Sequence, residues 1–157
     1  MTYSSNRFRH AILAAQRSGH RVLGNLLKPH GLTPAWAEVL TVLNNQGALT
    51  IRELSRYLIC EADHPSRLVS RMEAKGYLKR ETNPNDGRAF LISLTESGKS
   101  AMTIVEGAEA RLDHWITGQL TTAELDQISD VFEQMLRNTN EGKALIRRFT
   151  SDTNPHV

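Results

Sequence analysis

The segment 64–98 constrains the fold of this 157-residue chain more than any other part of the sequence. It has the pattern of a short helix with a basic stripe, followed by Gly76 and by two short strands. The loop between the strands, residues 83–87, has the sequence Asn-Pro-Asn-Asp-Gly, which is typical of a tight turn. The segment therefore predicts a helix followed at once by a β-hairpin, with Arg88 just beyond the hairpin loop.

Two further helices are predicted immediately before this segment. Thr33 is suited to cap a helix that has Pro34 at its first position, and residues 50–53 form a Thr-x-x-Glu capping box. A tight connection, residues 59–63, leads to the helix expected at 64–75, with Pro65 in its first turn. Two short helices, the helix at 64–75 and a hairpin are the parts of a winged helix-turn-helix. In this unit the third helix enters the major groove of DNA and is called the reading helix.

Long helices are predicted on both sides of this unit. Apolar residues recur at helical spacing in 6–28, a helix of about 24 residues begins at Thr95, and Thr121 opens another that ends near Arg137. Residues 141–149 are a candidate for a short extra helix. The expected fold class is mainly α with a small β-hairpin wing, in a single domain over residues 1–157.

Net charge alone does not argue for nucleic acid, because it is only +2, with 19 basic and 17 acidic residues. Its distribution is more informative. Residues 1–37 hold five basic residues and no acid, residues 67–88 are locally basic, and acids gather in the C-terminal third. This asymmetry predicts one basic face.

The helix at 64–75 carries its basic residues on one stripe. Arg67, Arg71 and Lys75 follow one another at intervals of four, opposite the apolar Leu68 and Met72. Arginine donates two parallel hydrogen bonds to guanine edges or phosphates, and Ser66 and Ser70 are short enough to sit beside it in a groove. A solvated helix face is the alternative, and the flanking helices and hairpin argue against it.

The hairpin adds a second candidate contact with DNA. Arg88 could enter a narrow minor groove, and Asp86 could hold Arg88 or the turn backbone in place. Lys79 and Arg80 on the first strand would reach phosphates only. An exposed ion pair is the alternative role of Arg88. The residues expected to touch DNA are His64, Ser66, Arg67, Ser70, Arg71, Lys75, Lys79, Arg80, Asp86 and Arg88.

An ordered set of residues between 31 and 98 resembles the MarR family of bacterial transcriptional regulators. The matching residues are Gly31-Leu32-Thr33, Leu49-Thr50 with Glu53-Leu54, Ser66-Arg67-Leu68-Val69 with Met72-Glu73, Gly76-Tyr77, Asp86-Gly87-Arg88-Ala89, Leu94-Thr95 and Gly98. The resemblance implies a DNA-binding lobe at about 32–98 and a helical dimerisation region at about 6–31 and 99–149. It also implies that Ser66, Arg67 and Arg71 are recognition contacts and that Arg88 is the wing arginine.

What such a protein does follows from the same resemblance. It implies a homodimer that binds double-stranded DNA at a pseudo-palindromic operator, most often as a repressor. A small anionic aromatic ligand, or oxidation, would release it. The chain departs from the family pattern at residues 61–65, where the helix is expected to begin late, with Asp63 or His64 as its cap.

The resemblance also implies an effector site between the long helices and the DNA-binding lobe. The first helix offers His10, Arg17, His20 and Arg21 with no acid beside them, and Trp36 could form an aromatic wall. A carboxylate ligand would find a charge-assisted partner there. The alternative is that these cations lie on the surface and help DNA approach or dimer packing.

Other function classes find little support in the sequence. Cys60, the one cysteine, is expected to be a buried, inert thiol, and the six histidines show no tight ligand spacing, so no metal or other cofactor is expected. No phosphate loop, carboxylate pair or nucleophile–base pair suggests an enzyme. With neither a signal peptide nor a membrane helix in the pattern, we expect a cytoplasmic protein. A winged helix used only for protein contact, and a redox- or metal-responsive regulator, remain alternatives.

Overall fold

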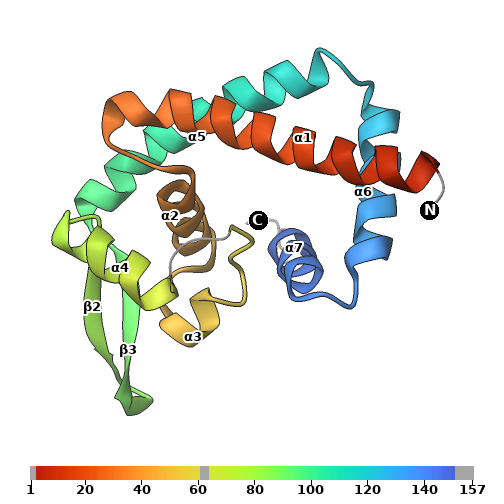
Figure 1. Ribbon diagram of the computed structural model, residues 1–157. Helices are drawn as coiled ribbons and strands as arrows, with labels where there is room; N and C mark the ends of the chain where they lie inside the picture. The colour runs from red at the N-terminus through yellow and green to blue at the C-terminus, as the bar shows by residue number, and fades with distance from the viewer. Residues whose placement is uncertain (1–2, 61–63, 151–157) are drawn as a thin grey trace, which may run out of the picture.

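The computed structural model describes residues 3–60 and 64–150. It is mostly helical with one small antiparallel sheet, so the predicted fold class is confirmed (Figure 1). The helices are α1 (Tyr3–Leu27), the 3₁₀ turn η1 (Lys28–His30), α2 (Pro34–Gln46), α3 (Ile51–Leu54), α4 (Pro65–Ala74), α5 (Glu96–Thr117), α6 (Thr122–Leu136) and α7 (Asn140–Thr150). The strands are β1 (Leu49–Thr50), β2 (Leu78–Asn83) and β3 (Asp86–Leu94).

The helix starts lie where the capping residues predict them. The Thr33 hydroxyl accepts a hydrogen bond from the Trp36 amide at 3.2 Å, with Pro34 as the first residue of α2. Both capping boxes form, at Thr50 with Glu53 and at Thr121 with Glu124. These bonds satisfy amides that would otherwise lack partners at the first turn of each helix.

The reading helix α4 differs slightly from expectation at both ends. It ends at Ala74, so Lys75 occupies the C-cap rather than the last turn, and Gly76 follows with φ +78°. At the other end His64 is the N-cap residue but makes no side-chain capping bond. The other candidate cap, Asp63, lies outside the described residues.

The sheet contains one strand that the sequence pattern did not predict. Its order is β1-β3-β2, with Leu49 opposite Ile92 and Thr50 opposite Leu91. Two residues are too few to show an alternating pattern, which is why β1 escaped prediction. The hairpin loop is also shorter than expected, because strand pairing reaches Asn83 and Asp86.

One hydrophobic core joins the helix-turn-helix to the long helices. Six of its fully buried side chains come from six different elements: Leu27 of α1, Leu40 of α2, Leu54 of α3, Met72 of α4, Ile92 of β3 and Val105 of α5. Burying side chains of this size contributes roughly 1.5–3 kcal/mol each, so this core fixes α4 and the hairpin on a rigid base.

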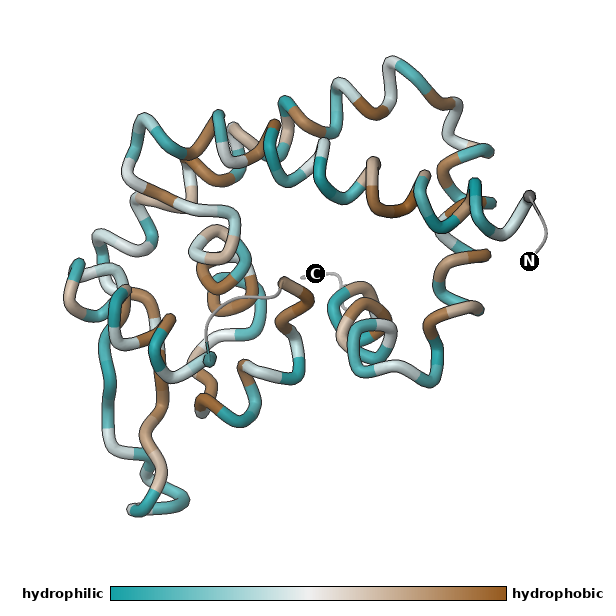
Figure 2. Tube along the Cα trace, viewed as in Figure 1, coloured by the Kyte–Doolittle hydropathy of each residue, from teal (hydrophilic) through white to brown (hydrophobic). Residues whose placement is uncertain are grey.

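The hairpin β2–β3 extends away from this core, while α1 and α5 lie alongside each other on another side of the molecule (Figure 1). The tip of the hairpin is hydrophilic, as Figure 2 shows. Residues 141–149, a candidate helix in the sequence, lie in α7, which turns back toward α3.

Candidate nucleic-acid interface

The exposed face of α4 carries the side chains that the sequence singled out. Arg67, Ser70 and Arg71 are exposed, and Ser66 is half-buried; together they line one shallow hollow on the surface. Their apolar neighbours Leu68, Val69 and Met72 are buried on the opposite side of the helix. The Nδ1 atom of His64 lies 3.1 Å from the Ser66 hydroxyl, at the start of the helix. Groups able to bind bases or phosphates are therefore presented together.

A bidentate ion pair connects the wing to α4. The Arg80 guanidinium on β2 binds the Glu73 carboxylate through Nη2 at 2.7 Å and Nε at 3.0 Å. Both side chains are only partly exposed, at 33% and 23%. The pair neutralises Glu73, the one acidic residue of α4, and holds β2 against the helix. Arg80, expected to reach phosphates, thus has a partner within the protein.

The tip of the wing is stiffened by two side-chain oxygens. The Asn83 Oδ1 accepts from the Asn85 amide and the Asp86 Oδ1 accepts from the Arg88 amide, each at 3.0 Å. Asp86 therefore holds the turn backbone, one of the two roles considered for it, and Arg88 is exposed beside it. Lys79 pairs with Glu81 on the same strand at 2.8 Å, and both side chains are exposed.

A cavity of about 550 Å³ lies between α1, α2 and the segment before α4. It brings together three of the expected effector residues, Arg17, His20 and Arg21, with Ala35 and Cys60 in its wall. Charged donors on one side and small side chains on the other suit a compact organic anion.

Two of the expected effector residues, His10 and Trp36, lie outside the lining of this cavity, and Cys60 is not buried as expected. His10 lies further along α1, where its Nδ1 contacts the Asn6 carbonyl at 2.9 Å. Trp36 packs edge-on against Tyr77, with ring centroids 5.8 Å apart, because the third position of α2 faces the core. Cys60 is half-exposed instead of buried, because it lies in the wall of this open cavity.

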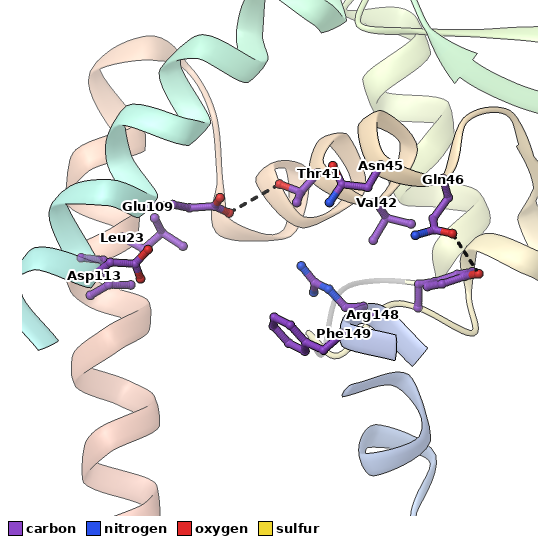
Figure 3. A pocket seen from close by; sticks show the side chains of 11 residues that line it. Leu23, Thr41, Val42, Asn45, Gln46, Glu109, Asp113, Arg148 and Phe149 are labelled. Carbon is purple, nitrogen blue, oxygen red and sulfur yellow. Dashed lines mark hydrogen bonds between the residues drawn. The ribbon is translucent and has the colours of Figure 1, made fainter. Parts of the chain in front are cut away.

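A second cavity, of about 410 Å³, was not anticipated from the sequence (Figure 3). Glu109 and Asp113 of α5 line one side, and Arg148 and Phe149 of α7 reach in from the other. The Thr41 hydroxyl donates to Glu109 at 3.5 Å. Burial raises the pKa of the Glu109 carboxyl, and Arg148 and Thr41 act in the opposite direction.

Two kinds of feature are absent from residues 3–60 and 64–150. No cluster of three or more His, Cys, Asp or Glu side chains that could hold a metal ion occurs there. In that part of the chain, no helix combines the length and the apolar character needed to cross a membrane.

A helix-turn-helix followed by a β-hairpin wing, on a base of long helices, defines the class: this is a winged helix-turn-helix protein. A family model described as the MarR family matches residues 30–89. The multiple antibiotic resistance protein MarR of Salmonella typhimurium is 30% identical over 120 residues, covering 74% of this chain and 81% of that protein. The chain belongs to the MarR family of DNA-binding transcriptional regulators.

Solved structures agree with this assignment. A mutant MarR of Escherichia coli, complexed with operator DNA, is 26% identical with a TM-score of 0.73, over 83% of this chain and 94% of that one. The organohalide-sensing regulator RdhR-CbdbA1625, in its 2,4-dichlorophenol-bound form, shares the fold at 20% identity and a TM-score of 0.78, over 89% and 83%. The relatives are regulators, not enzymes.

Proposed function

We propose that this protein is a homodimeric repressor whose α4 helices read successive major grooves of a pseudo-palindromic operator while the wings enter the adjacent minor grooves. The observation that carries the proposal is the joint presentation of Arg67, Arg71 and Arg88. The first two lie on the exposed face of α4 and the third on a wing that is tied to that helix by Glu73 and Arg80. A rigid link between helix and wing suits binding to both grooves at once.

Apolar residues left exposed on the long helices support a homodimer. They occur on α1, α5 and α6, where they would cost solubility on a monomer of this size. Phe8 is 44% exposed and stacks on Phe132 of α6, and Val131 is 52% exposed beside them. A two-fold dimer would bind half-sites about one helical turn apart, roughly 34–36 Å. The remaining large apolar side chains exposed on these three helices are Leu13, Val22, Trp115, Ile128 and Met135.

Repression, rather than activation, is supported by relatives. The transcriptional repressor IacR of Pseudomonas putida is 27% identical over 105 residues, and the repressor MprA of Escherichia coli is 25% identical over 118. We propose that the protein acts in the cytoplasm, where bacterial DNA lies.

A small organic anion is the effector that we propose. The cavity at Arg17, His20 and Arg21 offers two guanidinium groups with no carboxylate in its described lining, at the junction between α1 and the segment before α4. RdhR-CbdbA1625, which shares the fold, was solved with 2,4-dichlorophenol bound, an acidic aromatic molecule. An anion bound at this junction could change the placement of α4, and so the affinity for DNA.

The test is binding to a duplex selected by the wild-type protein from a randomised DNA library. Arg71→Ala and Arg88→Ala should each weaken specific binding by about 1–3 kcal/mol, and wild-type affinity should fall steeply with added salt. Arg137→Ala, in which the substituted arginine lies at the end of α6, is the matched control and should bind as wild type does. Unchanged affinity in both wing and helix variants would overturn the proposal. Failure of the wild-type protein to select any duplex would instead favour a winged helix used for protein contact.

A further inference from the structure

Glu38 of α2 is a buried acid that connects three parts of the chain. Its side chain is 8% exposed, and it is the one charged residue among the buried positions described. The Oε1 atom accepts from the Ile59 amide at 2.7 Å, and Oε2 accepts from the Cys60 amide at 3.0 Å. The Arg148 guanidinium of α7 donates to Oε1 at 2.8 Å.

The two amides held by Glu38 belong to the segment that leads into the reading helix. Cys60 lies five positions before Pro65, the first residue of α4. Glu38 thus fixes this segment to α2, a helix that contributes to the same hydrophobic core as α4. Only three residues separate Cys60 from His64, the N-cap of α4, so the position of Cys60 limits where α4 can begin.

A second arginine of α7 binds the same segment. The Arg147 guanidinium donates to the Arg56 carbonyl at 2.6 Å and lies 5.7 Å from the centre of the Tyr57 ring. Arg147 and Arg148 together form what we call the α7 clasp, two adjacent cations on residues 56–60 and on Glu38. The contacts join positions 91 and 110 residues apart in the sequence.

The ion pair between Arg148 and Glu38 differs from an exposed ion pair because the Glu38 carboxylate is buried. Two amide dipoles stabilise the Glu38 carboxylate, but they do not neutralise its charge, and water has little access to it. Arg148, itself 22% exposed, supplies the neutralising charge. Without Arg148, water would have to solvate the Glu38 carboxylate. The hydrated carboxylate would then bind the amides of Ile59 and Cys60 less strongly.

We propose that Arg148 and Glu38 are positioning residues for DNA recognition: through Glu38, the α7 clasp sets the segment before α4 and so the pose in which α4 meets DNA. The inference rests on the proposed DNA-binding function. Because α7 follows α6 through a tight corner, where Gly142 lies against the Leu136 backbone, the clasp also ties the reading helix to the long helices. Arg148 acts through Glu38 and touches no DNA.

The experiment measures binding of the full chain to the duplex selected by the wild-type protein, across a salt series. We expect Arg148→Met to weaken specific binding about tenfold, because only a fraction of molecules would hold α4 in the competent pose. The slope of log affinity against log salt should stay as in wild type, since no phosphate contact is lost. Amide hydrogen exchange at Ile59 and Cys60 should quicken. Lys143→Met is the matched control: it removes the same charge from an exposed side chain of the same helix.

A second pair of variants tests the route through Glu38. Glu38→Gln should weaken binding as Arg148→Met does, and the double variant should bind no more weakly than the weaker single variant. If Arg148→Met does not fold, as judged by circular dichroism, then Arg148→Gln, which keeps an N–H donor, takes its place under the same criteria.

Two results would overturn the inference. One is affinity within twofold of wild type in the Arg148 variant, and the other is a salt slope reduced by about one, which would make Arg148 a phosphate contact. Loss of duplex selection by the wild-type protein itself would be a failure of the proposed function, so the two failures are distinguishable.

Discussion

Single side chains in this protein divide into those that we propose contact DNA and those that hold the proposed contact groups in place. Arg67 and Arg71 are presented on the surface of α4. Glu73, Arg80 and Asp86 hold other parts of the same site, through an ion pair and a turn bond. A change at Arg71 should therefore alter contacts with DNA, whereas a change at Arg80 should alter the angle between wing and helix.

Glu109 gives a prediction at this scale because its environment disfavours the charged form. Burial raises the pKa of its carboxyl above the ordinary value of 4.5, so the folded state binds its proton more tightly than the unfolded state. This contribution to stability is complete below pH 4.5 and is lost as the pH rises through the raised pKa. Glu109→Gln should flatten that part of the stability curve, as measured by urea unfolding at a series of pH values above 4.5.

The exposed acid Asp126 of α6 provides the control for that measurement. Asp126→Asn changes the same charge at an exposed position and should leave the shape of the curve unaltered above pH 4.5. A wild-type curve that rises through this range, with the same rise in Glu109→Gln, would contradict the prediction for Glu109.

At the scale of elements, the junction between wing and α5 depends on a glycine. A Cβ atom at Gly98 would collide with the backbone carbonyl of Tyr77, which itself accepts the Thr95 amide at 3.0 Å. Because backbone cannot rotate away as a side chain can, we expect Gly98→Ala to destabilise the fold by about 1–3 kcal/mol. Urea unfolding measures this.

Gly107, in the middle of the same helix, is the matched control. A Cβ atom there would meet nothing within 4 Å, and the residue is exposed. Gly107→Ala should raise the free energy of unfolding by up to about 1 kcal/mol, since alanine favours the helix. A similar loss in both variants would show that the Tyr77 contact is unimportant.

Local sequence signals predicted most elements and the placement of the reading helix. The threonine caps, Pro34, Gly76 and the turn at 83–87 act over a few residues, so they can be recognised without the fold. Side-chain pairing across elements could not be predicted in this way. Nothing near Glu38 in the sequence indicates Arg148, and nothing near Trp36 indicates its core partner Tyr77, which lies 41 positions away.

At the scale of the whole molecule, the proposed homodimer would bury the exposed apolar residues of α1 and α6 against a partner copy. Val131→Asp places a charge in this surface, next to Phe8 and Phe132, and should shift the protein from dimer to monomer in sedimentation equilibrium. Because each monomer would bind a single half-site, operator affinity should fall as well.

Ser129→Asp is the control for the dimer prediction. It adds the same charge two residues away on α6, at an exposed position on a different side of the helix. It should leave the dimer intact. A wild-type protein that is monomeric at micromolar concentration would contradict the homodimer outright.

The central claim, that α4 and the wing bind different grooves of one operator, is tested most directly by footprinting on the selected duplex. Wild-type protein should protect guanine N7 from methylation in two major grooves and should protect the flanking minor grooves from hydroxyl radicals. Arg88→Ala should lose the minor-groove protection and, at saturating protein, keep the major-groove protection. Identical footprints for the two proteins, or loss of both kinds of protection together, would contradict the account.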